Sequence, residues 1–139
     1  PGDEKRTVAE VLLEPTIIYV QCVKSLMRDL PIKGMAHITG GGFYDNIPRV
    51  LPKQVEADIT FGSWDIPPVF HWLKDQAKLS WPEMLQIFNT GIGFVLILPE
   101  EKCEEAIGRI KAFHLNAWKI GTIAKRKSED TEQIQVSFD

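Results

Sequence analysis

Alternation of apolar and polar residues marks the strands of this chain. Residues 54–61 alternate without exception, and residues 133–138 repeat the pattern near the end. Residues 94–98 are apolar throughout and lie between glycine and proline, which is typical of a strand buried on both faces. Residues 35–39 form a short apolar run, and residues 118–124 form another strand candidate, in which Trp118 and Ile120 alternate with Lys119 before Gly121 interrupts the pattern. We expect residues 118–124 and 133–138 to pair as an antiparallel hairpin, because a polar turn separates them.

Apolar residues spaced by three to four predict helices between these strands. The first covers residues 16–30, with Ile17, Val20, Met27 and Leu30 on its apolar face, and Pro31 ends it. Others are expected over residues 66–77, 81–88 and 100–113, the last with its acidic residues first and its basic residues last, as the helix dipole favours.

Two helix starts carry a capping-box spacing, in which a hydroxyl residue precedes a glutamate by three positions. The pairs are Thr7 with Glu10 and Ser80 with Glu83. A third helix start is marked by Asp65 as a possible N-cap ahead of Pro67 and Pro68. The order helix, strand, strand, helices, strand, helix and paired strands predicts an α+β domain built on a mixed sheet.

Composition narrows the class of protein. The 139 residues suit one domain with a real core, and the net charge is −3 without a concentrated basic stripe, so we expect no nucleic-acid surface. The chain holds no run of 18 apolar residues, so we expect no membrane span. Cys22 and Cys103 lie far apart in apolar stretches, which predicts buried thiols in a reducing cytoplasm. The acidic start of the helix over residues 100–113 is interpreted as a solvated helix end, and no metal site is predicted.

The most informative segment is the glycine triplet Gly40, Gly41 and Gly42, which follows the strand at residues 35–39. Three glycines lose the most conformational entropy on folding, so a domain keeps them where the backbone needs positive φ or where another group approaches it closely. Bare amides between a strand and a helix suit an anion. The alternative is a tight turn that binds nothing, and the glycines alone do not decide between the two.

Four polar side chains flank the triplet. His37 and Thr39 share one face of the strand, because they lie two positions apart. Asn46 and Arg49 lie three positions apart, which would place them on one side of a helical turn. Singly, each has a structural interpretation as a core histidine, a strand hydroxyl, a helix cap and a surface charge. Together they favour a site for a phosphate-bearing substrate, and Asn89, Thr90 and Gly91 in a second glycine turn are weaker candidates for the same cleft.

Five motifs carry a resemblance to a known family. They are residues 37–43 (HITGGGF), 46–52 (NIPRVLP), 12–16 (LLEPT), 88–93 (FNTGIG) and 117–121 (AWKIG). In their order along the chain they resemble the C-terminal half of phosphoribosylformylglycinamidine cyclo-ligase, also called aminoimidazole ribonucleotide synthetase. The chain departs from the family pattern in three places: Glu14 stands where Thr or Ala is common, Ile17 where a basic residue is common, and Thr90 where Cys is common.

The resemblance implies a three-layer α/β/α arrangement, partly ferredoxin-like. It also implies that residues 1–139 form a single domain, the C-terminal half of a two-domain synthetase. The N-terminal half, which carries most of the ATP and Mg²⁺ site, is then absent, and the first residues are interpreted as a cut within a longer chain. The implied partners are this N-terminal domain and, in the full-length protein, a second subunit in a cytoplasmic homodimer.

The implied reaction is an ATP-driven ring closure of formylglycinamidine ribonucleotide to aminoimidazole ribonucleotide in purine biosynthesis. The substrate-binding residues expected from the residue pattern are His37, Thr39, Gly40, Gly41, Gly42, Asn46, Arg49, Asn89, Thr90 and Gly91. No catalytic base is assigned, and the fragment alone is expected to be inactive. Two alternatives remain: a related ATP-using enzyme, such as selenophosphate synthetase or thiamine-monophosphate kinase, and a non-catalytic phosphate-ligand-binding or interaction domain.

Overall fold

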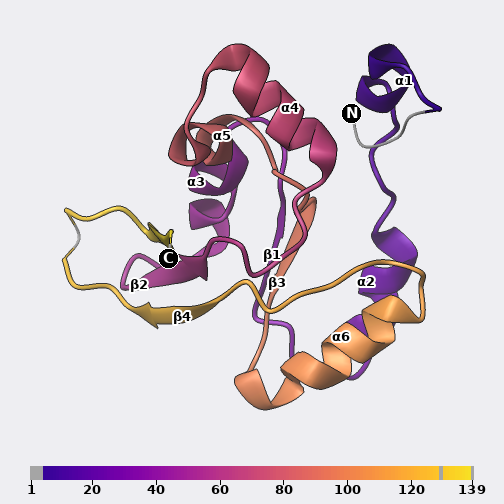
Figure 1. Cartoon of the computed structure of the whole chain (residues 1–139). Coiled ribbons are helices and arrows are strands. Elements are labelled where there is room, and N and C mark those ends of the chain that lie inside the picture. Colours follow the sequence, from indigo (N-terminus) through magenta and orange to yellow (C-terminus); the bar gives the residue numbers. More distant parts are fainter. Residues whose placement is uncertain (1–4, 129, 139) are drawn as a thin grey trace.

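The computed structural model describes residues 5–128 and 130–138, and it combines helices with a mixed set of strands, which confirms the α+β class (Figure 1). In chain order the elements are α1 (Val8–Leu12), α2 (Val20–Leu26), β1 (Gly34–His37), α3 (Gly42–Asn46), the 3₁₀ turn η1 (Pro48–Val50), β2 (Val55–Thr60), α4 (Pro68–Ala77), α5 (Trp81–Ile87), β3 (Phe94–Ile97), the 3₁₀ turn η2 (Glu100–Lys102), α6 (Cys103–Lys111), β4 (Gly121–Lys125) and β5 (Ile134–Ser137).

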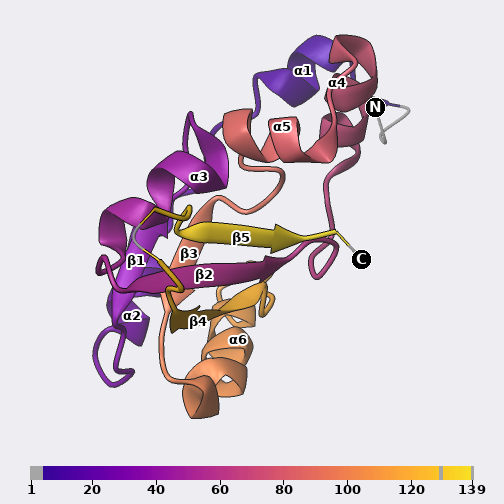
Figure 2. The same ribbon diagram turned by 90° about the vertical axis from the view of Figure 1, so that its left-hand side faces the viewer.

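The described strands form two sheets. β1 and β3 pair antiparallel, with Ala36 opposite Val95. The other sheet has the order β4-β2-β5, in which β2 is antiparallel to β4 and parallel to β5 (Figure 2). The predicted hairpin of residues 118–124 and 133–138 is therefore wrong. Both segments are strands, but each pairs with β2, which lies between them.

Helices cover both faces of the β1–β3 pair, as the three-layer expectation requires. On one face, Leu96 and Leu98 pack against buried Cys22 and Leu26 of α2 and Ala106 of α6. The opposite face contributes to a larger core that contains side chains from α3, α5, β2 and β5. Its buried members are Ala36, Ile38, Phe43, Ile47, Leu51, Ala57, Ile59, Trp64, Leu85, Ile92 and Ile134. β3 thus contacts a core on each face, yet all four of its residues stay partly exposed.

The helix predicted over residues 16–30 is shorter and rotated about its axis. α2 begins only at Val20, four positions after the start of the predicted range. Val20 and Met27, which were predicted to face the core, are 60% and 53% exposed, whereas Cys22 and Leu26 are buried. The helix is present, but the face that packs against the core is the one next to the predicted face.

An ion pair accompanies this orientation of α2. Arg109 of α6 donates hydrogen bonds to the Asp29 carboxylate, at 2.6 Å, and to the Ser25 carbonyl oxygen, at 2.8 Å. These bonds hold the C-terminal end of α2 against α6 with Leu26 inward. Cys22 is buried as predicted, and burial raises the pKa of its thiol, whereas Cys103 is only partly buried.

Both predicted capping boxes are confirmed. The Thr7 and Ser80 side chains accept from the backbone amides of Glu10 and Glu83, whose carboxylates in turn accept from the N-cap amides at 2.7 Å. The third predicted cap is not present, because α4 begins behind Pro67 without a side-chain cap bond. In the described ranges, no helix combines the length and apolar character needed to cross a membrane.

Candidate functional site

The glycine triplet forms a tight loop between β1 and α3. Gly41 and Gly42 have φ values of 89° and 55°, in the left-handed region that favours glycine. A Cβ on Gly42 would also collide with the carbonyl oxygen of Leu85 in α5. Gly40 differs from both, because a Cβ there would meet nothing within 4 Å. Two glycines of the triplet are thus required by backbone conformation and packing, and Gly40 is not.

Asn46 braces this loop from the last position of α3. Its buried side-chain amide donates to the carbonyl oxygens of Thr39, Gly40 and Gly42, at 3.3, 3.2 and 2.8 Å. Its own carbonyl accepts from the Thr39 hydroxyl at 3.4 Å. Because these bonds use the donors of the side chain, Asn46 acts on the shape of the loop and holds its amides in place.

The loop leaves two backbone amides open to another group. The Gly42 amide donates to the Thr39 carbonyl at 3.1 Å. For the Gly40 and Gly41 amides, the described part of the chain contains no hydrogen-bond acceptor, and Gly40 lies at the surface. These N–H groups, next to an exposed hydroxyl residue, can donate to an anion that approaches from solvent.

His37 and Thr39 lie on the same exposed side, since the intervening Ile38 and the preceding Ala36 are buried. The His37 ring lies 6.0 Å, centroid to centroid, from both Tyr19 and Phe94. Packing between these rings fixes the imidazole at the end of the β1–β3 ladder, three positions before Gly40. Burial raises the pKa of the Tyr19 hydroxyl, so this group stays protonated and neutral at physiological pH.

The structure separates Asn46 from Arg49, which the sequence spacing placed on one side of a helical turn. α3 ends at Asn46, and Pro48 begins a new 3₁₀ turn, so the helical register is not continued. Asn46 points inward, and Arg49 lies at the surface. Arg49 can therefore contact a group bound at the glycine loop only by extending its long side chain.

The second glycine turn lies at the same end of the β1–β3 ladder as the first, because the Ile38 amide donates to the Gly93 carbonyl at 2.9 Å. Its polar groups mainly bond within the protein. The Asn89 side-chain oxygen accepts from the Gly91 amide at 3.1 Å, and the Thr90 carbonyl accepts from the Trp64 indole at 3.0 Å. The Thr90 hydroxyl is fully buried and has no partner among the described residues. This turn thus supports the strand end through its bonds to Gly91 and Trp64.

Sequence inspection missed an acidic hollow beside the glycine loop. Gly41, Tyr44, Asp45, Gln86 and Glu132 line a depression of about 430 Å³. Burial, and secondarily the charge of Glu132, raises the pKa of the Tyr44 hydroxyl. An anion in this hollow would face two carboxylates, so the favourable approach to the loop is on the Gly40 side. Glu132 lies 91 positions from Gly41 in sequence, which is why no local pattern revealed it.

Within residues 5–128 and 130–138, no three His, Cys, Asp or Glu residues come together in a way that could hold a metal ion. The fold and the loop define an α+β domain that presents backbone amides at the end of an antiparallel strand pair.

Comparison with known proteins is consistent with this class. Residues 2–133 match the family model described as AIR synthase related protein, C-terminal domain. Among curated proteins, the chain is 62% identical to the phosphoribosylformylglycinamidine cyclo-ligase of Nitratidesulfovibrio vulgaris, 57% identical to that of Oleidesulfovibrio alaskensis and 53% identical to that of Lawsonia intracellularis. Each alignment covers 99% of this chain and 39% of the relative.

The chain belongs to the family of C-terminal domains of AIR-synthase-related proteins. It spans about two fifths of the length of the curated relatives that it matches. The resemblance of the five sequence motifs to this family is therefore confirmed.

Proposed function

We propose that this chain is the C-terminal part of an ATP-dependent cyclo-ligase that converts formylglycinamidine ribonucleotide to aminoimidazole ribonucleotide in purine biosynthesis. The observation that carries the proposal is identity of 53% to 62% over almost the whole chain with relatives that bear the cyclo-ligase name. Because the chain spans only 39% of those relatives, the activity is that of the longer protein, and the 139 residues alone are inactive.

In this proposal the glycine loop holds the ribose phosphate of the substrate. Gly40 and Gly41 donate their free amides, and Thr39 and His37 line the exposed approach. Asn46 positions the loop through its three carbonyl bonds instead of touching the phosphate. Such a role suits the reaction, because ring closure of a flexible acyclic substrate depends on orientation more than on a covalent nucleophile.

The reaction proposed for the longer protein transfers a phosphoryl group from ATP to the formyl oxygen of the substrate. This transfer releases ADP. Attack by the amidine nitrogen on the activated formyl carbon then forms the C–N bond that closes the ring, and the C–O bond breaks with release of phosphate. On the resemblance to the family, we place ATP and Mg²⁺ mainly on the part of the longer protein outside this chain. The proposal also places the longer protein in the cytoplasm as a homodimer. The resemblance to the family is the sole support for this part.

Gly40→Ala in the full-length protein tests the phosphate-binding role. The added methyl group has open space in the free protein, so stability should not change, but it would stand where the phosphate approaches the main chain. Loss of one charge-assisted hydrogen bond should raise the KM for the ribonucleotide about tenfold or more and leave kcat nearly unchanged.

Gly108→Ala in α6 is the matched control, because its Cβ also meets nothing within 4 Å and the position is helical. This variant should keep the wild-type KM. If Gly40→Ala and Gly108→Ala have equal KM values for the ribonucleotide, the glycine loop does not bind the phosphate. Calorimetric titration with the ribonucleotide, in parallel with the turnover assay, distinguishes an enzyme from a binding module that holds the ligand without converting it.

A further inference from the structure

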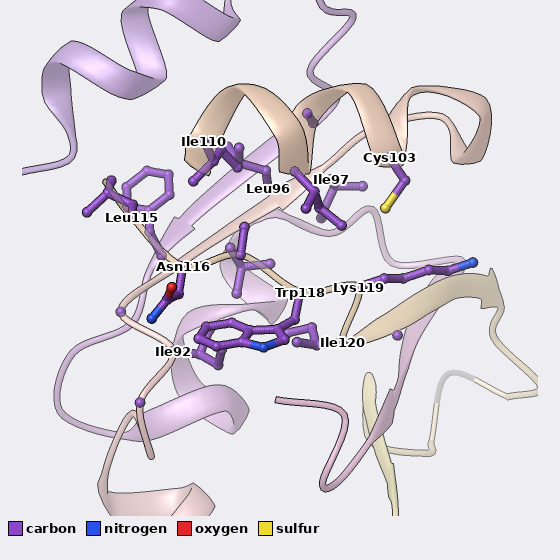
Figure 3. A pocket seen from close by; sticks show the side chains of 18 of the residues that line it. Ile92, Leu96, Ile97, Cys103, Ile110, Leu115, Asn116, Trp118, Lys119 and Ile120 are labelled. Atoms are coloured by element: carbon purple, nitrogen blue, oxygen red, sulfur yellow. The ribbon is translucent and has the colours of Figure 1, made fainter. Parts of the chain in front are cut away.

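An apolar groove, which the three glycines of the glycine loop do not line, is shown in Figure 3. It has a volume of about 780 Å³ and lies between α6, β3 and the segment that leads into β4. Leu96 and Ile97 contribute from β3, Ile110 from α6, and Trp118 and Ile120 from the segment before β4 (Figure 3). A groove of this size and composition is larger than a packing defect between neighbouring side chains.

The groove follows the outer edge of β3. All five residues from Phe94 to Leu98 line it. Successive side chains of a strand point to opposite faces of the sheet, so a groove over one face would be lined by every second residue only. Lining by consecutive residues places the groove along the strand edge. The other edge of β3 is paired with β1.

β4 borders the groove in the same way. Gly121, Thr122 and Ile123 line it as consecutive residues, and the paired edge of β4 faces β2. The groove therefore separates two strand edges for which the described residues provide no partner. An unpaired apolar edge is a template for another strand.

Backbone directions agree with this arrangement. The bond from the Ile38 amide to the Gly93 carbonyl fixes the alternation of the β1–β3 ladder, so that the N–H groups of Phe94 and Leu96 point away from β1. In the β2–β4 ladder, the Thr60 amide donates to the Ile120 carbonyl. The N–H groups of Gly121 and Ile123 on β4 therefore point away from β2.

Both walls above and below the groove are apolar. The α2–α6 side contributes Cys22, Leu26 and Ile110, and the larger core contributes Ile47 and Ile59. At the rim, the charges of Lys119 and Glu100 already neutralise each other at 2.6 Å. An occupant must therefore be apolar on both faces and must offer hydrogen bonds at both edges, which describes a buried β-strand.

We propose that a β-strand from the part of the parent polypeptide outside these 139 residues occupies this groove. It pairs with β3 on one edge and with β4 on the other, and so joins the two sheets into one. The relatives supply the length for such a strand, because this chain accounts for 39% of them. The inference depends on that length and not on the proposed reaction, so either can fail without the other.

Amide hydrogen exchange of the full-length protein at single-residue resolution tests the proposal. Val95 and Ile97 point toward β1 and are protected in either case, which makes them internal controls. With a strand in the groove, Phe94, Leu96 and Ile123 should exchange at rates within about tenfold of those controls. With an empty groove, protection should alternate along β3, and Phe94 and Leu96 should exchange about 100-fold faster than their neighbours.

Alternating protection along β3 would overturn the proposal. So would protection of Phe94 and Leu96 that falls on dilution, because a second copy of the chain would then be the occupant. Protection that disappears after extensive dialysis would instead indicate a small apolar ligand and would equally overturn it. Uniform protection of β3 and β4 that does not depend on protein concentration or dialysis is the result we expect.

Discussion

The side-chain amide of Asn46 lies 2.8 Å from the carbonyl oxygen of Gly42, so the last residue of α3 is bonded to the first. The same amide reaches the carbonyl oxygens of Thr39 and Gly40, which belong to the loop before the helix. One side chain thus holds the turn whose free amides form the candidate phosphate site.

Asn46→Ala should lower the free energy of unfolding by about 2 kcal/mol. The substitution removes the side-chain amide that donates to several loop carbonyls, and the buried Gly42 carbonyl oxygen then loses this partner. Urea denaturation of the chain measures the change. Asn116→Ala is the control, because Asn116 lies at the surface and its substitution should alter stability by less than about 0.5 kcal/mol. Equal effects of the two substitutions would show that Asn46 does not brace the loop.

Gly42→Ala should destabilise the fold much more than Gly40→Ala. At Gly42 the left-handed backbone alone costs about 1–2 kcal/mol for a residue with a Cβ, and the collision with the Leu85 carbonyl adds to that cost. At Gly40 the methyl group meets open space. The urea midpoints of the two variants should therefore differ clearly, with Gly40→Ala close to wild type. A Gly42→Ala variant as stable as Gly40→Ala would contradict the packing of α3 against α5.

Local chemistry explains which parts of the fold the sequence predicted. The capping pairs Thr7–Glu10 and Ser80–Glu83 lie within one helical turn, so their spacing is sufficient to place two helix starts. Residues 55–60 form a strand as their alternation indicates. The glycine triplet was also interpretable, because positive φ at Gly41 and Gly42 is a property of the backbone at those positions.

Contacts between distant segments explain the rest. β4 and β5 follow each other in sequence, yet β2 lies between them, and no pattern within residues 118–138 contains that information. The face of α2 that packs is set by contacts with α6, whose Arg109 lies more than 80 positions from Ser25. In the candidate site, the acidic hollow depends on Glu132 in the same way. Asn46 looked like a ligand-binding amide because sequence does not show which side of a short helix is buried.

Thr90→Val should stabilise the protein by about 1 kcal/mol, because it keeps the shape of the side chain and removes a buried hydroxyl without a partner among the described residues. Thr90→Cys should also stabilise, since it removes both the hydroxyl and the β-branch at a residue with a φ of 47°. Urea denaturation of both variants measures the effects. A lower midpoint for Thr90→Val would mean that the hydroxyl has a partner, such as a buried water molecule.

The Ser80–Glu83 capping box should make stability depend on pH in the acidic range. Hydrogen bonds from the Ser80 side chain and from its backbone amide lower the pKa of the Glu83 carboxyl. The unfolded chain then takes up this proton first as pH falls. The stabilisation is fully present above the ordinary glutamate pKa of about 4.3 and is lost as pH falls through the lower value of the folded state.

Thermal unfolding of wild type and Glu83→Gln between about pH 7 and pH 3 measures this effect. Wild type should have the higher Tm near neutral pH, and the difference should shrink below about pH 4, where the carboxylate becomes protonated. Glu104→Gln is the control, since Glu104 is an exposed carboxylate in α6 for which the described chain offers no capping bond. A difference between wild type and Glu83→Gln that stays constant with pH would mean that the charged carboxylate does not stabilise the start of α5.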